Sequence, residues 1–159
     1  KYCMVVICAQ KKGLIINMTR LTYFGKLPEE IKKKYNSVLE VERAYIDKTK
    51  PGNVMDDIFK EGKKAYHIEG FPGEEKKHFQ GGTCGYLTRE QGLEPGNQYV
   101  IQKNEIFAHN PSIQGVKIED SIYIDNDGSI ELLTLSDNWP SRIVEVNGQD
   151  ICRPEILIQ

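Results

Sequence analysis

Apolar residues follow a strand pattern at the start of the chain, a helical pattern in the middle and a strand pattern again afterwards. Residues 3–9 form a continuous apolar run with β-branched residues at its centre. After the turn Gln10–Gly13, residues 14–23 resume the pattern. Short apolar runs bounded by turn residues are typical of strands. The pattern therefore predicts a β-hairpin whose first strand is buried.

Residues 25–52 have the spacing of a long helix. Pro28 and the two glutamates after it suit the first helical turn, and the Pro-Gly pair at 51–52 ends the helix. Its apolar face comprises Ile31, Tyr35, Val38, Leu39 and Tyr45.

A second helix follows at once. We expect Asn53 to cap its first turn, since an asparagine side chain can accept a hydrogen bond from a free backbone N–H. Gly70 and Pro72 then stop the helix. The expected inner face contains Val54, Ile58, Ala65 and Tyr66 or Ile68.

Beyond residue 75 the chain has a strand-and-turn pattern. The sequence DNDG at 125–128 predicts a hairpin turn. The C-terminal residues 137–159 alternate like one or two further strands, with Trp139 packed at a sheet edge. The expected strands cover residues 98–102, 105–110, 115–125, 129–135 and 141–147. This order predicts a single α+β domain over residues 1–159, with a curved, mostly antiparallel sheet and helices on one face.

Charge and composition narrow the classes of partner. The net charge is -2, so no strong positive field favours nucleic acid or an acidic membrane surface. No apolar run approaches the ~20 residues of a membrane-spanning helix. The 4 cysteines form no C-x-x-C pair, which argues against a zinc knuckle and favours a reduced, cytoplasmic protein. The chain opens directly in an apolar strand, so we expect it to be part of a longer protein.

Two segments carry candidate chemistry. His78 precedes a glycine-rich turn, where a lone histidine is either a metal ligand or, more often, a hydrogen-bonded structural residue. In KIEDSIYI (117–124), strand alternation places Lys117, Glu119 and Ser121 on one face and Asp120 on the other. An acidic pair inside an apolar strand is costly unless it is paired or bound to a cation. The alternative is an edge strand whose carboxylates face water.

Five segments, in order, resemble the pita-bread metallopeptidases, a superfamily that includes methionine aminopeptidase, Xaa-Pro aminopeptidase, prolidase and creatinase. GLIINMTR (13–20) resembles the family's G-x-x-x-D-x-T-R strand, and KPGNVMDDIFKEG (50–62) resembles its Pro-Gly helix start. HFQGG (78–82) resembles the segment with the ligand histidine, and EPGNQYVI with HNPS (94–101, 109–112) resembles the P-G then E-P strand. VKIEDSIYIDNDGSIELLT (116–134) resembles the R-I-E-D strand and closing hairpin. The resemblance extends to about residue 135 and implies the pita-bread α+β fold.

The usual members of this superfamily hold two divalent metals with two aspartates, one histidine and two glutamates. Metals so placed share a hydroxide that attacks the peptide carbonyl. The resemblance places Val6 and Asn17 at the two aspartate positions, His78 at the histidine and Glu119 at the last glutamate.

The first glutamate position falls on Asn110, or on Gln102 in a second register, while Glu105 would need a third. Lys117 replaces the arginine that usually precedes the last glutamate by two residues. Segment 83–86 lacks the second histidine that steadies the tetrahedral intermediate in the family.

Only His78 and Glu119 therefore remain as metal ligands, whereas a stable metal site needs three or four. We expect no tightly held metal and no cofactor; the alternative is weakly bound manganese, cobalt or zinc.

Three interpretations follow from these positions. The chain could be an Xaa-Pro peptidase with a rearranged metal site. It could instead be a metal-free relative whose pocket binds a peptide or small polar ligand, with Lys117 paired to Glu119. It could also be a fragment that needs a missing N-terminal half or forms a homo-oligomer. The expected pocket is lined by Asn17, His78, Gln80, Tyr86, Arg89, Asn110, Lys117 and Glu119.

Overall fold

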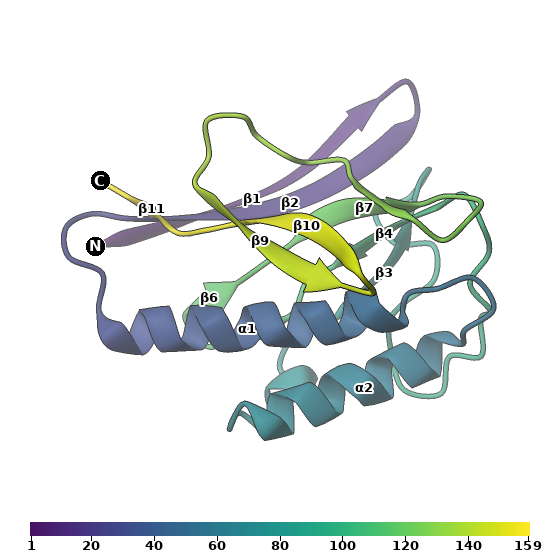
Figure 1. Ribbon diagram of the computed structural model, residues 1–159, viewed down its shortest axis with the longest axis horizontal. Coiled ribbons are helices and arrows are strands. Elements are labelled where there is room, and N and C mark those ends of the chain that lie inside the picture. Colours follow the sequence, from purple (N-terminus) through teal and green to yellow (C-terminus); the bar gives the residue numbers. More distant parts are fainter.

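Two helices lie along one side of a set of strands (Figure 1). A computed structural model describes residues 1–159, with helices α1 (Glu29–Lys48) and α2 (Met55–Ile68) and the 3-10 turn η1 (Glu74–Lys76). The strands are β1 (Tyr2–Lys11), β2 (Leu14–Tyr23), β3 (Gly81–Cys84), β4 (Glu105–His109), β5 (Ser112–Ile113), β6 (Val116–Lys117), β7 (Asp120–Ile124), β8 (Ile130–Leu132), β9 (Ser141–Val146), β10 (Gln149–Pro154) and β11 (Leu157–Ile158).

The strands form a central sheet in the order β3-β4-β7-β8 and a second sheet in the order β1-β2-β11. The pairs β9–β10 and β5–β6 complete the set. Every ladder is antiparallel except β11 with β2. An isolated bridge between Thr19 and Glu119 joins the two larger sheets, so it brings the first hairpin to the middle of the molecule. The predicted α+β architecture with helices on one face is confirmed.

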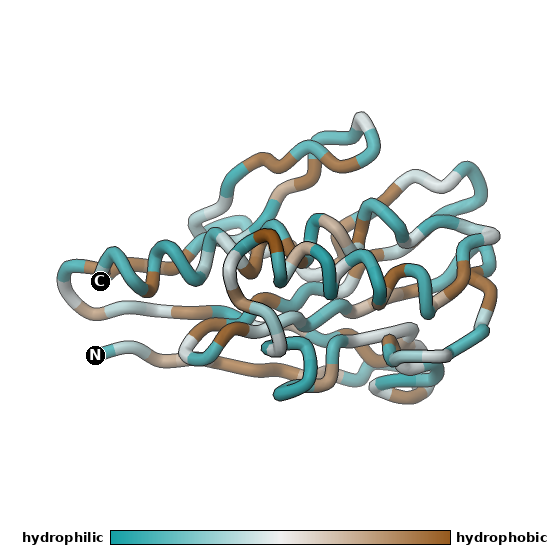
Figure 2. Tube along the Cα trace, turned by 90° about the horizontal axis from the view of Figure 1, so that it is seen from below, coloured by the Kyte–Doolittle hydropathy of each residue, from teal (hydrophilic) through white to brown (hydrophobic).

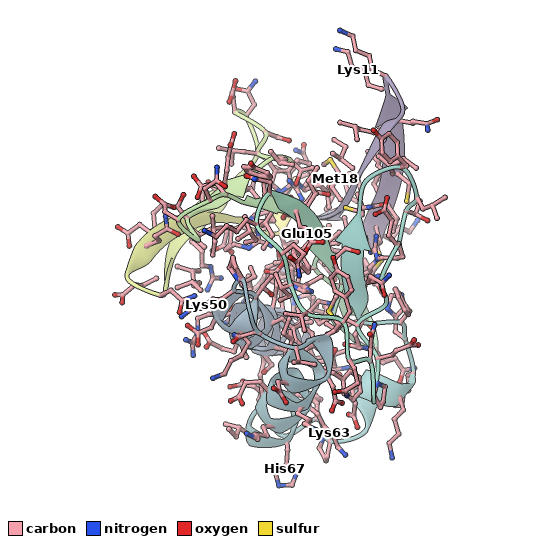
Figure 3. The ribbon with its side chains drawn as sticks, turned by 90° about the vertical axis from the view of Figure 1, so that its right-hand side faces the viewer. Lys11, Met18, Lys50, Lys63, His67 and Glu105 are labelled. Atoms are coloured by element: carbon pink, nitrogen blue, oxygen red, sulfur yellow. The ribbon has the colours of Figure 1, made fainter.

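The first hairpin forms as predicted, but the expected burial of its first strand is wrong. Strand β1 pairs only with β2, and of its ten residues only Met4 is even half-buried. Val6, for example, is 51% exposed. The tip of the hairpin, marked by Lys11, projects beyond the rest of the molecule (Figure 3). An apolar run identifies a strand but not its neighbours, so it could not tell an edge strand from a central one.

The helices are shorter than their sequence patterns. Helix α1 buries Tyr35, Val38, Leu39 and Tyr45 as predicted, while Ile31 is half-buried. Seen from below, both helices show hydrophilic positions along most of their length, with apolar ones at intervals (Figure 2). The buried residues of both helices are mostly apolar, so the face turned toward the strands is the apolar one.

The cap predicted for α2 is wrong. Val54 occupies the N-cap position, and the Asn53 side chain donates instead to the carbonyl of Lys48 at 2.8 Å, at the end of α1. The two helices approach closely at Gly62, where an added Cβ would lie 1.8 Å from the Tyr45 ring. Glycine at 62 therefore fixes the packing of α2 on α1.

Two predicted strands differ in the structure. Residues 98–102 form no strand, only a bridge between Val100 and Val54. The predicted strand 115–125 is broken between β6 and β7, at the position of Glu119. The DNDG hairpin is confirmed, and the C-terminal segment contains the β9–β10 hairpin and β11. Neither helix combines the length and hydropathy that crossing a membrane would require.

Candidate functional site

Glu119 lies at the break between β6 and β7 and is 2% exposed. One of its carboxylate oxygens, Oε2, accepts hydrogen bonds from Lys117 Nζ at 2.8 Å and Thr19 Oγ1 at 2.9 Å. The other, Oε1, accepts one from Arg89 Nη2 at 2.8 Å. The predicted Lys117–Glu119 ion pair is confirmed, and the water-facing alternative for this carboxylate is wrong.

Two effects oppose each other at the Glu119 carboxyl. Burial alone would raise its pKa, but the neighbouring Lys117 and Arg89 outweigh burial and lower the pKa below its ordinary value. Glu119 is therefore a carboxylate whose charge is balanced by side chains of the protein itself.

A second group of polar side chains adjoins this one across β2 and β7. Ser121 Oγ accepts from the backbone N–H of Asn17 at 2.8 Å and donates to its carbonyl at 3.1 Å. The Asn17 side chain is 0% exposed, yet neither its nitrogen nor its oxygen has a hydrogen-bond partner. Buried amides without partners are uncommon in proteins and call for an explanation.

The thiol of Cys84 lies beside Asn17 and Ser121. Burial raises the pKa of this thiol, while the charge of Arg89 acts in the opposite direction. Cys84 is therefore held as a neutral thiol, which is neither a strong nucleophile nor a good metal ligand.

These residues share one face of the strands, opposite the face that packs on the helices. Cross-strand partners point to the same side, and Val6 pairs with Thr19 while Cys8 pairs with Asn17. The positions that the resemblance assigned to the two aspartates therefore lie on the Glu119 face. Together we call the polar members the Glu119 cluster: Asn17, Thr19, Cys84, Arg89, Asn110, Lys117, Glu119 and Ser121.

Asn110 enters this cluster by alternation. Its neighbour His109 faces the helices, because its ring bonds Thr49 Oγ1 at 2.8 Å and packs on Tyr45. Ala108 pairs with Ser121 of the cluster, and Asn110, two residues further along, takes the same face when alternation is continued past the end of β4. It is 6% exposed, and its side-chain oxygen has no partner.

Two of the predicted site residues, Gln80 and Tyr86, lie elsewhere. The Gln80 side chain accepts from the hydroxyls of Tyr45 and Tyr66 at 2.9 and 3.0 Å, so it faces the helices. Tyr86 is 74% exposed and lies near the turn of the first hairpin at Gly13. His78 is half-buried with an unpartnered Nδ1, and no hydrogen bond or ion pair joins it to Glu119.

The sequence analysis did not include three members of the cluster among the site residues: Thr19, Cys84 and Ser121. Alternation from Glu119 already placed Ser121 on the correct face. Thr19 lies in the T-R part of the first motif, where its side chain could have been noticed. Nothing in the spacing indicated Cys84, because β3 reaches Asn17 only through tertiary packing.

The loop after Cys84 covers the cluster. It is fixed at its start by Ile15, whose N–H donates to the carbonyl of Gly85 at 2.7 Å, and at its end by paired bonds between Thr83 and Gln91. Arg89 extends from this loop to Glu119, and its guanidinium lies 5.9 Å from the centre of the Phe79 ring. Arg89 is the most exposed charged member of the cluster, with 16% of its side chain accessible, so solvent approaches from its side.

The neighbouring carboxylate of Asp120 faces the helices and belongs to a separate network. It accepts from Arg20 at 2.8 Å and lies 3.2 Å from Arg153, which in turn binds Glu42 of α1 through two hydrogen bonds. All four side chains are at most 5% exposed. The adjacent carboxylates Glu119 and Asp120 thus point to opposite faces, each with its own cations.

No group of three or more histidine, cysteine, aspartate or glutamate side chains in the chain is arranged to hold a metal ion. Two surface grooves, of about 860 and 370 Å³, lie away from the Glu119 cluster. The larger one runs along α2 and is lined mainly by charged residues, including Lys63 and His67 at the lower edge of Figure 3.

Two helices lie behind an antiparallel sheet, and the strand that begins with the aspartate of the sequence KIED lies inside it. This agrees with the pita-bread arrangement that the resemblance implied. The profile of metallopeptidase family M24 matches residues 1–126, and the chain belongs to this family.

Individual proteins resemble the chain in sequence or in fold. The chain is 32% identical over 124 residues to the uncharacterized peptidase MW1651 of Staphylococcus aureus, covering 74% of this chain and 35% of that protein. A prolidase of Thermococcus sibiricus superposes with a TM-score of 0.77 at 22% identity, covering 99% of this chain and 40% of the other. The N-terminal domain of the FACT complex subunit SPT16 from chickpea superposes with a TM-score of 0.70 at 17% identity, covering 84% and 35% of the two chains. The chain thus spans well under half the length of these proteins.

Proposed function

We propose that this chain is a prolidase-like member of family M24 that works without a two-metal centre and binds a peptide or small polar ligand, with little or no hydrolysis. The observation that carries the proposal is Glu119. Both of its oxygens are occupied, by Arg89 on one side and by Lys117 and Thr19 on the other, at 2.8 to 2.9 Å. Three of the roughly four lone-pair sites of this carboxylate are thus taken, and two cations lie beside it, so it is a poor ligand for a dication.

The remaining positions fit a metal pair poorly. Val6 offers no donor atom, and Asn17 and Asn110 are neutral amides that cannot balance charge as carboxylates do. Two dications would also lie beside the ammonium of Lys117 and the guanidinium of Arg89. Repulsion between like charges at such distances is strongly unfavourable in a buried site. The residues present do not fit the family's metals, and no catalytic step is assigned to them.

The alternative is an active metallopeptidase that hydrolyses Xaa-Pro peptides with a rearranged site, or one completed by parts of a longer protein. The observation in its favour is His78, whose unpartnered ring nitrogen could still accept a metal. Prolidase-like relatives much longer than this chain leave room for further ligands.

The cytoplasmic location that the composition predicts remains a proposal, and the structure places none of the cysteines in a disulfide. All four cysteines are free, and two of them, Cys3 and Cys8, are exposed. We propose that the protein works in a reducing compartment and that its exposed β1 edge can support homo-oligomers.

A peptidase assay tests the proposal directly. We expect no release of proline from the dipeptide Ala-Pro, with or without added Mn²⁺ or Co²⁺, because Glu119 is held by internal cations. Free proline is measured by chromatography, with a prolidase run in parallel as the positive control. Proline release that requires Mn²⁺ and stops on chelation would establish the metallopeptidase alternative instead.

A further inference from the structure

We infer that the Glu119 cluster binds the carboxylate of an amino acid or short peptide, held by Lys117 and Arg89 on the face where the family's metals would lie. This inference rests on the proposed metal-independent function and specifies its ligand.

The charge of the cluster is the first reason. Lys117 and Arg89 contribute two positive charges against the single negative charge of Glu119, with side-chain exposures of 10%, 16% and 3%. The adjacent Asp120 cannot compensate, because it faces the helices and is paired with Arg20 and Arg153. A net positive charge in a largely buried site is costly unless an anion accompanies it.

Uncommitted donors are the second reason. Arg89 Nε is buried without an acceptor, and the only acceptor beside Asn17 Nδ2 is the weakly accepting thiol of Cys84. Lys117 donates to Glu119 alone, although an ammonium group carries three N–H bonds. A carboxylate presents two oxygens with several lone pairs, and hydrogen bonds between ionised partners are about twice as strong as neutral ones. An anion would therefore satisfy donors that the protein leaves open.

Uncommitted acceptors narrow the class of ligand. The side-chain oxygens of Asn17 and Asn110 are also buried without a donor. A ligand that carries an ammonium group as well as a carboxylate can serve both kinds of open group. Amino acids and short peptides have this combination, whereas a simple inorganic anion offers fewer donors.

Arg89 gives the ligand a route to the cluster. It lies on the covering loop, it is the most exposed charged member, and the ring of Phe79 beneath its guanidinium is 44% exposed. The guanidinium can release Glu119 and bind an incoming carboxylate with both nitrogens, the geometry that arginine favours.

Binding of three probes tests this inference: Ala-Pro, its C-terminal amide and inorganic phosphate. We expect calorimetry on the unaltered chain to show that Ala-Pro binds at least ~10-fold more tightly than the amide, as loss of a charge-assisted bond predicts. Lys117→Met should weaken Ala-Pro binding by about 10-fold or more, since it removes a cation. Glu119→Gln should strengthen it, because the competing internal carboxylate is gone. Lys64→Met, on the exposed side of α2, is the matched control and should change nothing.

Equal affinity for the acid and the amide, or binding of neither, would overturn the inference without any variant. So would weaker binding by Glu119→Gln, or a response to phosphate without one to Ala-Pro. If a variant fails to fold, the affinities of the unaltered chain for Ala-Pro and for its amide still test the inference. None of these outcomes bears on the proposal that the chain lacks a two-metal centre. That proposal fails separately if the protein binds one or more metal ions per chain.

Discussion

Replacing Arg153 with methionine is expected to lower the free energy of unfolding by about 3–5 kcal/mol, the usual cost of removing one partner from a buried ion pair. Arg153 is 2% exposed and binds Glu42 of α1 through two hydrogen bonds while lying 3.2 Å from Asp120 of β7. Its loss leaves Glu42 without a cation at the junction of helix and sheet. Chemical denaturation followed by circular dichroism measures the change.

The loss should also depend on pH. Burial raises the pKa of the Glu42 carboxyl to about 7 even though Arg153 opposes the shift, and removal of Arg153 raises it further. A carboxyl whose folded pKa lies above its unfolded value stabilises the fold when protonated, so stability is lost as pH rises through this range. The deficit of Arg153→Met should therefore be larger near about pH 8 than near about pH 5.

The matched control is Arg142→Met. Arg142 also pairs with a glutamate, Glu155, but its side chain is 38% exposed. Exposed pairs contribute about 0–1 kcal/mol, so a small and nearly pH-independent effect is expected. Equal losses in the two variants would show that the buried network does not hold α1 to the sheet.

The second large effect is a gain of metal binding when carboxylates return to the strand face. The variant Val6→Asp, Asn17→Asp, Asn110→Glu places three carboxylates beside Glu119, on the face that the strand pairing defines. Without metal we expect it to be destabilised, because its three added carboxylates exceed the single excess positive charge of this largely buried cluster. Mn²⁺ should then raise its melting temperature, since a ligand that binds only the folded state stabilises it.

A neutral variant controls for the changes in shape. Val6→Asn, Asn110→Gln keeps similar side-chain sizes without added charge, and Mn²⁺ should leave its melting temperature unchanged. If Mn²⁺ stabilised neither variant, the alignment of these positions with the family's ligands would be wrong.

Much of the fold could be predicted from local sequence. The hairpin, both helices and the DNDG turn follow from hydrophobic period and turn chemistry, which act over neighbouring residues. The predicted pairing of Lys117 with Glu119 was also available, because residues two apart on a strand share a face.

What the sequence could not show depends on contacts between distant segments. The exposure of β1 is set by which strands lie beside it, and the orientation of Gln80 by the hydroxyls of Tyr45 and Tyr66. The pairing of Arg89 with Glu119 joins residues from a loop and a strand end that no periodic pattern connects. Alternation predicts the face of a residue, but its partner is decided by tertiary packing.

The resemblance to the family added what periodicity could not. It identified positions 6, 17, 78, 110 and 119 as a set. The strand register puts the first two on the face of Glu119, whereas no hydrogen bond or ion pair joins His78 to Glu119. The substitutions at these positions are read from the sequence, whereas their consequence, a carboxylate paired with two internal cations, is visible only in the structure.

Elemental analysis of the purified, unaltered chain after equilibration with Mn²⁺ tests the central claim most directly. Because Lys117, Thr19 and Arg89 occupy Glu119, we predict well under one bound ion per chain. Two ions per chain that survive desalting would contradict the account, and would show that Glu119 exchanges its internal partners for metal.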